Sequence, residues 1–195
     1  MRYWLGLLAV FYTSFVAAAP EYFLIDEFHT YPHFAIDHMG FSTLYGRFDQ
    51  TNGKIIIDRA NNNGYIDISI SAVSVNTGNE KRDEHLRSAD FLNISENPKI
   101  IYKSTNISFV GNDRAKVEGN LTLMGVTKPV SLDVQRIHCG NNPVTNQYTC
   151  GFEATASIKR SDFGSTFDYP NVGDNMKLWF DVEAIRDNAA TGVLR

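Results

Sequence analysis

Three of the five histidines, His29, His33 and His38, fall close together and raise the question of a metal centre. A zinc site needs three convergent ligands, whereas successive residues of a strand point to opposite faces of a sheet. His33 lies four residues after His29 and five before His38, and this spacing matches no familiar zinc pattern. Packing and hydrogen-bonding roles explain these side chains better, so we expect no metal ligands among them.

Nucleophilic and nucleotide chemistry lack a motif in this chain. No GxSxG segment marks an activated serine, and neither GxGxxG nor a P-loop is present. Arg160, Ser161 and Asp162 are consecutive and resemble a polar catalytic corner. The simpler interpretation is that Arg160 and Asp162 fix the end of a strand by hydrogen bonding. We therefore expect a protein that is not an enzyme and has no catalytic residues and no resident cofactor.

Composition and charge narrow the class of protein further. The chain has 195 residues, 43% of them apolar, which suffices for one domain with a substantial core and is little for two. It carries 22 acidic and 18 basic side chains, for a net charge of −4. An acidic surface exerts no general attraction on phosphate backbones, so we expect no nucleic-acid partner.

The first residues have the layout of a secretory signal. An apolar run over residues 3–16 is too short for a good membrane span, and the small residues Ala17–Ala19 follow it. We expect cleavage after Ala18 and a periplasmic or secreted protein. The chain thus divides into a signal peptide at 1–18, one domain at 19–188 and a tail at 189–195.

The two cysteines are consistent with export. Cys139 and Cys150 flank the turn-rich segment Gly140–Pro143, which lies between two strand-like runs. A disulfide that closes this hairpin loop would stabilise the fold by roughly 2–4 kcal/mol, mainly by restricting the unfolded chain. The sequence alone leaves open whether the two residues are paired.

Alternation of apolar and polar residues recurs after residue 20, and sustained helical periodicity does not. Turn signals such as Asn61–Gly64 separate the alternating runs. The pattern predicts an all-β fold, either an antiparallel barrel or a sandwich, with about eight or more strands. The predicted strands are Tyr22–Ile25, His33–Met39, Gly46–Phe48, Lys54–Asp58, Tyr65–Ser71, Lys99–Ser104, Asn106–Val110, Lys116–Met124, Val130–Gln135, Phe152–Lys159 and Lys177–Ala184.

One polar segment, Thr77–Leu92, interrupts this series of strands, and we call it the flap. Thr77 and Glu80 have the spacing of a capping box, and Asp83 precedes Arg87 by four residues, the favourable order for a helical ion pair. These features predict a short helix. Because the apolar residues of the flap lie near its carboxyl end, only that end can dock on a core. The flap is either a lid or rim, or a solvated connector.

The size of the expected barrel bears on function. About eight strands enclose a space that side chains can fill, or that can hold one small apolar ligand. Gly119, Ala154 and Ala156 fall on faces expected to point inward. They leave volume for a ligand unless aromatic side chains from other strands occupy it, and patterning alone does not decide between the two.

Several motifs in order make the chain similar to the YceI-like family, over about residues 22–185. They are Ile25–His29, Phe34–Ser42, Gly46–Phe48, the flap, Asn97–Ile100, Lys103–Thr105, Gly119–Val130, Ile158–Gly164 and Val172–Asp174. The resemblance implies an extended, antiparallel, lipocalin-like β-barrel of about eight strands with one short helix. It also implies an apolar tunnel that takes up a polyisoprenoid tail, such as that of a polyprenyl phosphate or a quinone.

Motif position and strand parity then select candidate ligand-binding residues. The candidates for the lumen are Phe34, Ile36, Leu121, Leu123, Phe152, Ile158, Phe163 and Phe180. The candidates for the mouth and the lipid head group are His38, Arg47, Arg82, Phe91, Leu92, Arg160 and Asp162. The expected partners are an amphiphilic isoprenoid lipid and, transiently, a membrane surface. The oligomeric state stays open and includes a homodimer.

Two other classes of protein remain alternatives. A cyclase-like or isomerase-like enzyme with a hydrophobic substrate would need a carboxylate or histidine isolated inside the lumen, and only His38 lies in the expected inward set. An accessory protein of a membrane redox or stress system would instead show a solid core and an exposed apolar patch.

Overall fold

The computed structural model of the chain describes residues 18–190, and nearly all of the expected signal peptide and most of the tail lie outside them. The strands are β1 (Glu21–Ile25), β2 (Tyr31–His38), β3 (Ser42–Phe48), β4 (Thr51–Asp58), β5 (Asn63–Ser71), β6 (Val75–Asn76), β7 (Lys99–Val110), β8 (Arg114–Leu123), β9 (Val126–Asn141), β10 (Tyr148–Lys159) and β11 (Val172–Arg186). Two short 3₁₀ turns, η1 (Ala72–Ser74) and η2 (Arg160–Phe163), and the helix α1 (Glu80–Arg87) complete the fold.

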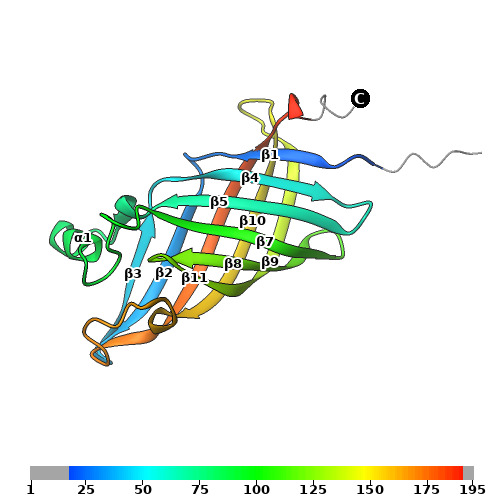
Figure 1. Cartoon of the computed structure of the whole chain (residues 1–195). Coiled ribbons are helices and arrows are strands. Elements are labelled where there is room, and N and C mark those ends of the chain that lie inside the picture. Colours follow the sequence, from blue (N-terminus) through cyan, green and yellow to red (C-terminus); the bar gives the residue numbers. More distant parts are fainter. Residues whose placement is uncertain (1–17, 191–195) are drawn as a thin grey trace, which may run out of the picture.

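Eight strands close into a ring in the order β1-β4-β5-β7-β8-β9-β10-β11, and β11 pairs back onto β1. Every pairing in the ring is antiparallel. Strands β2, β3 and β6 continue the sheet from β11 and extend the wall. Figure 1 shows α1 (green) and the loop after η2 (orange) at the same end of the barrel. The predicted antiparallel barrel of about eight strands with one short helix is confirmed.

The extension arises because the first hairpin of the chain is bent. Strand β1 pairs antiparallel with β4, with Phe23 opposite Ile55, and β2 pairs antiparallel with β3, with His33 opposite Arg47. The break between β1 and β2 is fixed at Thr30, which is 0% exposed. Its hydroxyl donates to the Glu183 carbonyl at 3.1 Å and accepts from the Glu183 amide at 3.1 Å. The chain thereby leaves β1, stays attached to β11 and continues as the wall at the α1 end.

Strand β7 joins two segments that alternation predicts as separate strands. The pairing of β7 with β8 shifts register between Ser104 and Asn106, which is the point where the alternation breaks. Ser104 is buried, and its hydroxyl accepts a hydrogen bond from the amide of Ile66 on β5 at 2.8 Å. A bulge within one strand therefore replaces the expected break between two strands, and the Ser104 side chain satisfies the Ile66 amide beside it.

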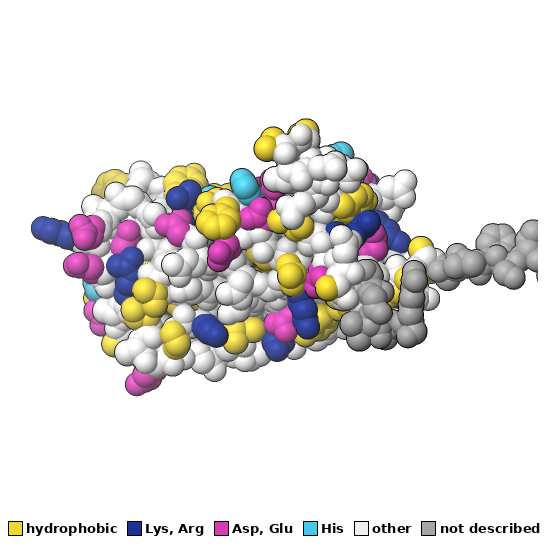
Figure 2. Space-filling view, turned by 90° about the horizontal axis from the view of Figure 1, so that it is seen from above, with side chains coloured by type: hydrophobic (Ala, Val, Ile, Leu, Met, Phe, Trp, Pro, Cys, Tyr) yellow, Lys and Arg dark blue, Asp and Glu magenta, His cyan; other side chains and the backbone are white. Residues whose placement is uncertain are grey.

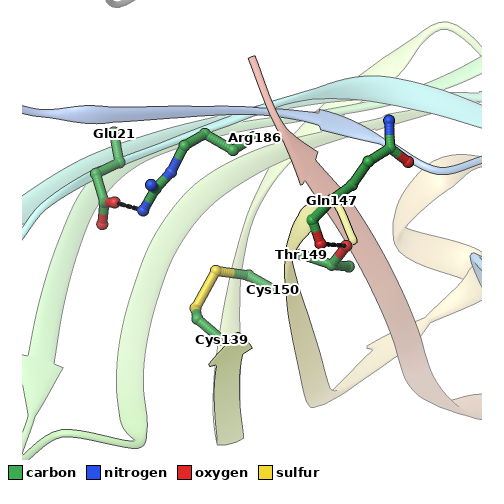
Figure 3. The surroundings of a disulfide bond; sticks show 6 residues. All are labelled: Glu21, Cys139, Gln147, Thr149, Cys150 and Arg186. Carbon is green, nitrogen blue, oxygen red and sulfur yellow. Dashed lines mark hydrogen bonds and ion pairs between the residues drawn. A yellow bond between two sulfur atoms is a disulfide. The ribbon is translucent and has the colours of Figure 1, made fainter. Parts of the chain in front are cut away.

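Inward side chains form two apolar clusters. The smaller one surrounds the disulfide that joins Cys139 on β9 to Cys150 directly opposite on β10 (Figure 3). Cys150 is 0% exposed, so the bond is part of the core as well as a link across the hairpin. The larger cluster takes side chains from β5, from β7 to β10 and from η2, and it includes Tyr102, Val117 and Phe163. The outer surface in Figure 2 shows acidic and basic side chains interspersed, without a field of one sign.

The helix of the flap forms, but its predicted cap is wrong. Asn79 is the N-cap, and its side chain accepts a hydrogen bond from the Arg82 amide at 3.1 Å. Asp83 accepts hydrogen bonds from the amide and hydroxyl of Thr77, and Arg87 donates to the carbonyls of Val73 and Val75. The predicted Asp83–Arg87 ion pair is therefore also absent, because both side chains bond to the chain before the helix. These contacts attach α1 to the barrel.

Candidate functional site

The barrel encloses one large apolar cavity of about 410 Å³. This volume falls within the range typical of small-molecule sites. Isoleucine, leucine, valine and phenylalanine side chains from the ring strands and from β2 make most of its wall. The ring strands contribute, among others, Ile55, Ile57, Ile66, Ile68, Ile70, Ile100, Ile107, Val117, Val130, Val134, Ile137 and Leu178.

Most of the candidate lumen residues lie on this wall. They are Phe34, Ile36, Leu121, Leu123, Phe152, Ile158 and Phe180. Phe163 does not lie on the wall: it is 2% exposed and packs in the larger core cluster. Phe163 is selected by the motif Ile158–Gly164 and not by strand parity, and it lies beyond β10 in the 3₁₀ turn η2.

Tyr102 fills part of the lumen beside a glycine. A Cβ atom at Gly119 would lie 2.4 Å from the Tyr102 hydroxyl oxygen, so the ring occupies the space that a side chain would take. The hydroxyl donates to the Val130 carbonyl at 3.0 Å, and burial raises the pKa of Tyr102, which keeps it neutral. An aromatic ring thus fills the space beside a small residue at this position, yet a cavity remains.

Arg160 has a structural role at the mouth. Its guanidinium is not free, as a residue that binds a lipid head group would require. It is 3% exposed and donates to four main-chain carbonyls, those of Ser165, Phe167, Val172 and Gly173, at 2.8–3.1 Å. Burial lowers the pKa of Arg160, and the nearby Asp174 and Asp168 oppose that shift. Arg160 lies on the cavity wall, but its hydrogen bonds fix the loop that borders the mouth.

Asp162 and Arg47 lie off the cavity wall. Asp162 is exposed on the outer side of η2, and the carboxylate that fixes the strand end is instead Asp174. Asp174 accepts hydrogen bonds from the amide and hydroxyl of Ser161 at 2.9 and 2.8 Å, and the backbone bond lowers the pKa of Asp174. Arg47 pairs with Asp49 at 2.7 Å on the outer face, because the neighbouring Gly46 takes the inward position on β3.

The flap meets the loop after η2 across the mouth. The rings of His85, Phe91 and Phe167 pack edge to face, with centroids 5.0–5.3 Å apart. His85 also lies 2.9 Å from the carboxylate of Asp90. All three rings line the cavity, together with Leu92. The flap is thus a lid with an apolar underside, and we call this triad of rings the gate.

Arg82 is the cation of the flap that lines the cavity. Its Nε donates to the Thr77 hydroxyl at 2.7 Å, and one Nη donates to the Thr77 carbonyl at 2.9 Å. Within residues 18–190, the other Nη atom has no hydrogen-bond partner. Because Asp83 in turn holds Thr77, the guanidinium is oriented at the mouth while part of its donor capacity stays unused.

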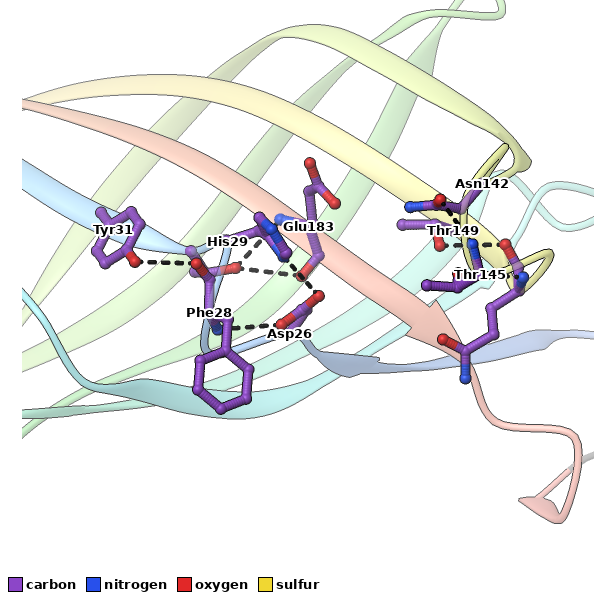
Figure 4. Close-up of polar contacts among 10 residues, drawn as sticks. Asp26, Phe28, His29, Tyr31, Asn142, Thr145, Thr149 and Glu183 are labelled. Atoms are coloured by element: carbon purple, nitrogen blue, oxygen red, sulfur yellow. Dashed lines mark hydrogen bonds and ion pairs between the residues drawn. The ribbon is translucent and has the colours of Figure 1, made fainter.

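The three clustered histidines do not converge. His38 is half-buried at the rim and lines the cavity, whereas the ring of His33 stacks on Trp179 at 5.2 Å, and burial lowers its pKa. His29 lies in the break between β1 and β2, 2.9 Å from Asp26 (Figure 4), and this hydrogen bond raises the pKa of His29. With Glu183, these two side chains are the one group in the described chain whose ligand atoms could hold a metal ion.

Sequence reasoning missed the loop after η2 as part of the site. Ser165, Phe167 and Asp168 all line the cavity. The segment from Gly164 to Asn171 shows no alternation, so parity could not assign its side chains a face. The sequence offered no signal for this loop, because the burial of Arg160, whose guanidinium needs several acceptors around it, appears only in the structure.

No helix among the described residues is long and apolar enough to cross a membrane. Taken together, the closed antiparallel ring, the apolar interior and the lid place this protein among β-barrels that enclose a ligand-sized cavity. The model of the YceI-like domain matches residues 23–184, and the chain belongs to this family.

Relatives and solved structures agree with this assignment. The chain is 39% identical over 184 residues to a UPF0312 protein of Pseudomonas aeruginosa, covering 93% of this chain and 95% of the relative. The YCEI protein of Campylobacter jejuni is 29% identical, with a TM-score of 0.69 over 78% of this chain and 90% of that one. A polyisoprenoid binding domain from Saccharophagus degradans shares the fold at 17% identity, with a TM-score of 0.61 over 85% of this chain and 98% of that one.

Proposed function

We propose that this protein binds the tail of a long-chain isoprenoid lipid, of the polyprenyl phosphate or quinone type, and carries or stores it without chemical change. The observation that carries the proposal is the apolar cavity of about 410 Å³ beneath a lid. The polyisoprenoid binding that names the Saccharophagus degradans domain supports the choice of tail.

Burial of the tail supplies the affinity. Each methylene group that leaves water contributes about 0.8 kcal/mol, so even part of a long chain binds strongly. The cavity wall is an array of aliphatic and aromatic groups without directional demands. Such a wall accepts a flexible tail better than it selects a rigid polar substrate.

The head group interacts with Arg82 rather than with Arg160. Arg82 lines the mouth and keeps unused donors, whereas four carbonyls occupy Arg160. A guanidinium can donate a hydrogen bond to a phosphate oxygen or to a quinone carbonyl. The bond to the phosphate is stronger because both groups are charged. His38, on the same rim, offers a second polar contact.

Binding without catalysis fits the polar groups of the cavity. Among the described residues that line it, Asp168 is the one carboxylate, and it accepts a hydrogen bond from the Asn171 side chain at 2.9 Å. In the described chain, three histidines line the cavity, and none is isolated inside the lumen, as the enzyme alternative requires: His38 is half-buried at the rim, His33 stacks on Trp179 and His85 belongs to the gate. The alternative of an accessory protein predicts a solid core, and the cavity argues against it.

We further propose that the protein acts in the periplasm or outside the cell and exchanges its ligand with a membrane surface. The signal-like segment at residues 1–18 is the basis for export, and a water-insoluble ligand is the basis for membrane exchange. The disulfide between Cys139 and Cys150 fits an oxidising compartment.

The proposal is tested by extracting purified protein with organic solvent and identifying the lipids by mass spectrometry. A fluorescent fatty-chain probe then measures binding to the delipidated protein. Ala154→Phe, which projects into the cavity, should abolish probe binding, while Thr155→Phe, next to it on the outer face of β10, should not. Absence of an extracted lipid together with equal probe binding by both variants would refute the proposal.

A further inference from the structure

Four large apolar side chains are exposed at the mouth end of the barrel, and we call them the rim patch. Phe41 is 89% exposed, Tyr169 62%, Met39 48% and Phe167 42%. Met39 and Phe41 form the tip of the β2–β3 hairpin, and Phe167 and Tyr169 belong to the loop after η2. Turn tips normally carry polar residues, so apolar groups at both tips need an explanation.

The two tips lie side by side. The Met39 amide donates to the Asn171 carbonyl at 2.7 Å, and His38 pairs with Val172. Segments about 130 residues apart in the chain therefore meet at this end of the barrel, and the four exposed side chains belong to two neighbouring tips rather than to scattered positions.

Both tips are held in shape from within. The Asp37 carboxylate accepts from the Gly40 amide at 2.9 Å and closes the hairpin turn. Arg160 binds the carbonyls of Ser165 and Phe167 and fixes the other loop. The apolar groups are thus presented by rigid backbone, which lowers the entropy lost when they dock.

The patch is continuous with the cavity. Phe167 is both a rim residue and a member of the gate, where its ring contacts Phe91 at 5.2 Å. A lipid tail that leaves the cavity past Phe91 meets Phe167 first and then the exposed side chains beyond it. Phe167 thus carries apolar surface from the lumen to the outside of the mouth, beside the polar groups of His38, Ser165 and Asp168.

The charges around the patch identify the kind of surface it fits. Residues 38–45 and 163–171 contain no lysine or arginine. The nearest carboxylates, Asp37 and Asp168, are engaged in turn hydrogen bonds. A surface of this kind has no attraction for anionic head groups and depends on apolar contact, with the Tyr169 hydroxyl suited to the interfacial layer of a bilayer.

We propose that the rim patch inserts into the interfacial layer of a phospholipid bilayer and holds the mouth of the cavity against the membrane. The proposal rests on the proposed function, since the membrane is the source and destination of the tail. A protein partner would favour a patch bordered by complementary charges or unsatisfied donors. The absence of lysine and arginine from the two tips, residues 38–45 and 163–171, and the engaged carboxylates of Asp37 and Asp168 favour the bilayer.

The test measures co-sedimentation of the delipidated full-length mature protein with phosphatidylcholine vesicles. The wild type should bind these neutral vesicles, and added salt should leave binding unchanged. The double variant F41S/Y169S should bind the vesicles about tenfold more weakly or worse, because two aromatic groups no longer leave water. Val144→Ser is the matched control, since Val144 is 90% exposed on the β9–β10 loop.

Each outcome decides the proposal. Equal vesicle binding by the wild type and F41S/Y169S, or binding that requires anionic lipid and disappears in salt, would overturn it. So would a wild type that binds the fatty-chain probe but no vesicles, since the cavity then works without this contact. Probe binding should be unchanged in F41S/Y169S, because neither residue lines the cavity. A wild type that binds vesicles through the patch but no probe would refute the proposed function and leave the patch intact.

Discussion

Replacing Arg160 by methionine tests whether this arginine is a clamp or a ligand residue. Methionine keeps an apolar stem of similar length and removes every donor. The carbonyls of Ser165, Phe167, Val172 and Gly173 then lose a hydrogen bond each. All four belong to the loop and strand that border the mouth, so the loss falls on the rim and on the attachment of η2 to β11.

The magnitude follows from these contacts. A hydrogen bond to a charged group contributes about 1.5–3 kcal/mol, so four give roughly 6–12 kcal/mol as an upper bound. Water reaches part of the exposed loop in the variant and satisfies some of the carbonyls. With two carbonyls left buried and unsatisfied, at about 1–3 kcal/mol each, the free energy of unfolding should fall by roughly 2–6 kcal/mol. For a chain of this size the Tm should then fall by roughly 4–24 °C.

The assay is chemical and thermal unfolding followed by circular dichroism. Arg136→Met is the control, because Arg136 pairs with Glu153 at 2.7 Å on the surface, with both side chains more than half exposed. That change should cost about 1 kcal/mol at most. If Arg160→Met is no less stable than the control and instead loses only probe affinity, the clamp interpretation is wrong and Arg160 is a ligand residue.

Three other perturbations address separate parts of the barrel. Reducing the disulfide, which closes a short loop, should lower the free energy of unfolding by about 3 kcal/mol, and unchanged melting with and without reductant would contradict this. Gly119→Ala should cost about 1–3 kcal/mol because Tyr102 must move, while Gly140→Ala, with open space at Cβ, should cost far less in the same denaturation assay. Asp26→Asn should return the NMR-measured pKa of His29 toward 6.5. Because that pKa is raised in the fold, the stabilisation is complete below pH 6.5 and is lost as pH rises through the folded-state pKa, so the stabilities of wild type and variant should converge at high pH.

The lumen was predictable because strand parity is a local property. Leu121, Leu123 and Phe152 follow from alternation within single strands, and the structure brings them to one cavity without further information. Alternation ends at η2, and Asp162 and Phe163, which the motif Ile158–Gly164 selects, do not lie on the cavity wall. A 3₁₀ turn rotates successive side chains by a different angle from a strand, and no period announces its start.

The flap shows a second limit of sequence reasoning. A short helix was predicted correctly, since charged helix-forming residues cluster there, but the cap was assigned to Thr77 rather than Asn79. Both residues have side chains that can cap a helix. Asp83, a residue of the helix, prevents Thr77 from acting as the cap. Its carboxylate accepts hydrogen bonds from the Thr77 amide and hydroxyl, and the hydroxyl in turn accepts one from Arg82. A contact of this kind depends on how the helix sits on the barrel and has no signature in spacing alone.

The mouth therefore consists of two firmly attached frames and a weaker contact between them. On one side Arg87 binds the Val73 and Val75 carbonyls and attaches α1 to the barrel, and on the other Arg160 fixes the loop after η2. Among residues 18–190, the ring contacts of Phe167 with His85 and Phe91 join the frames directly, and an aromatic pair contributes about 0.5–1.5 kcal/mol beyond its burial. Entry of a lipid tail thus requires separation of the rings and no unfolding of either frame. Since one ring, Phe167, is also part of the rim patch, insertion of that patch into a bilayer would compete with the gate contact and favour the open mouth where the lipid is exchanged.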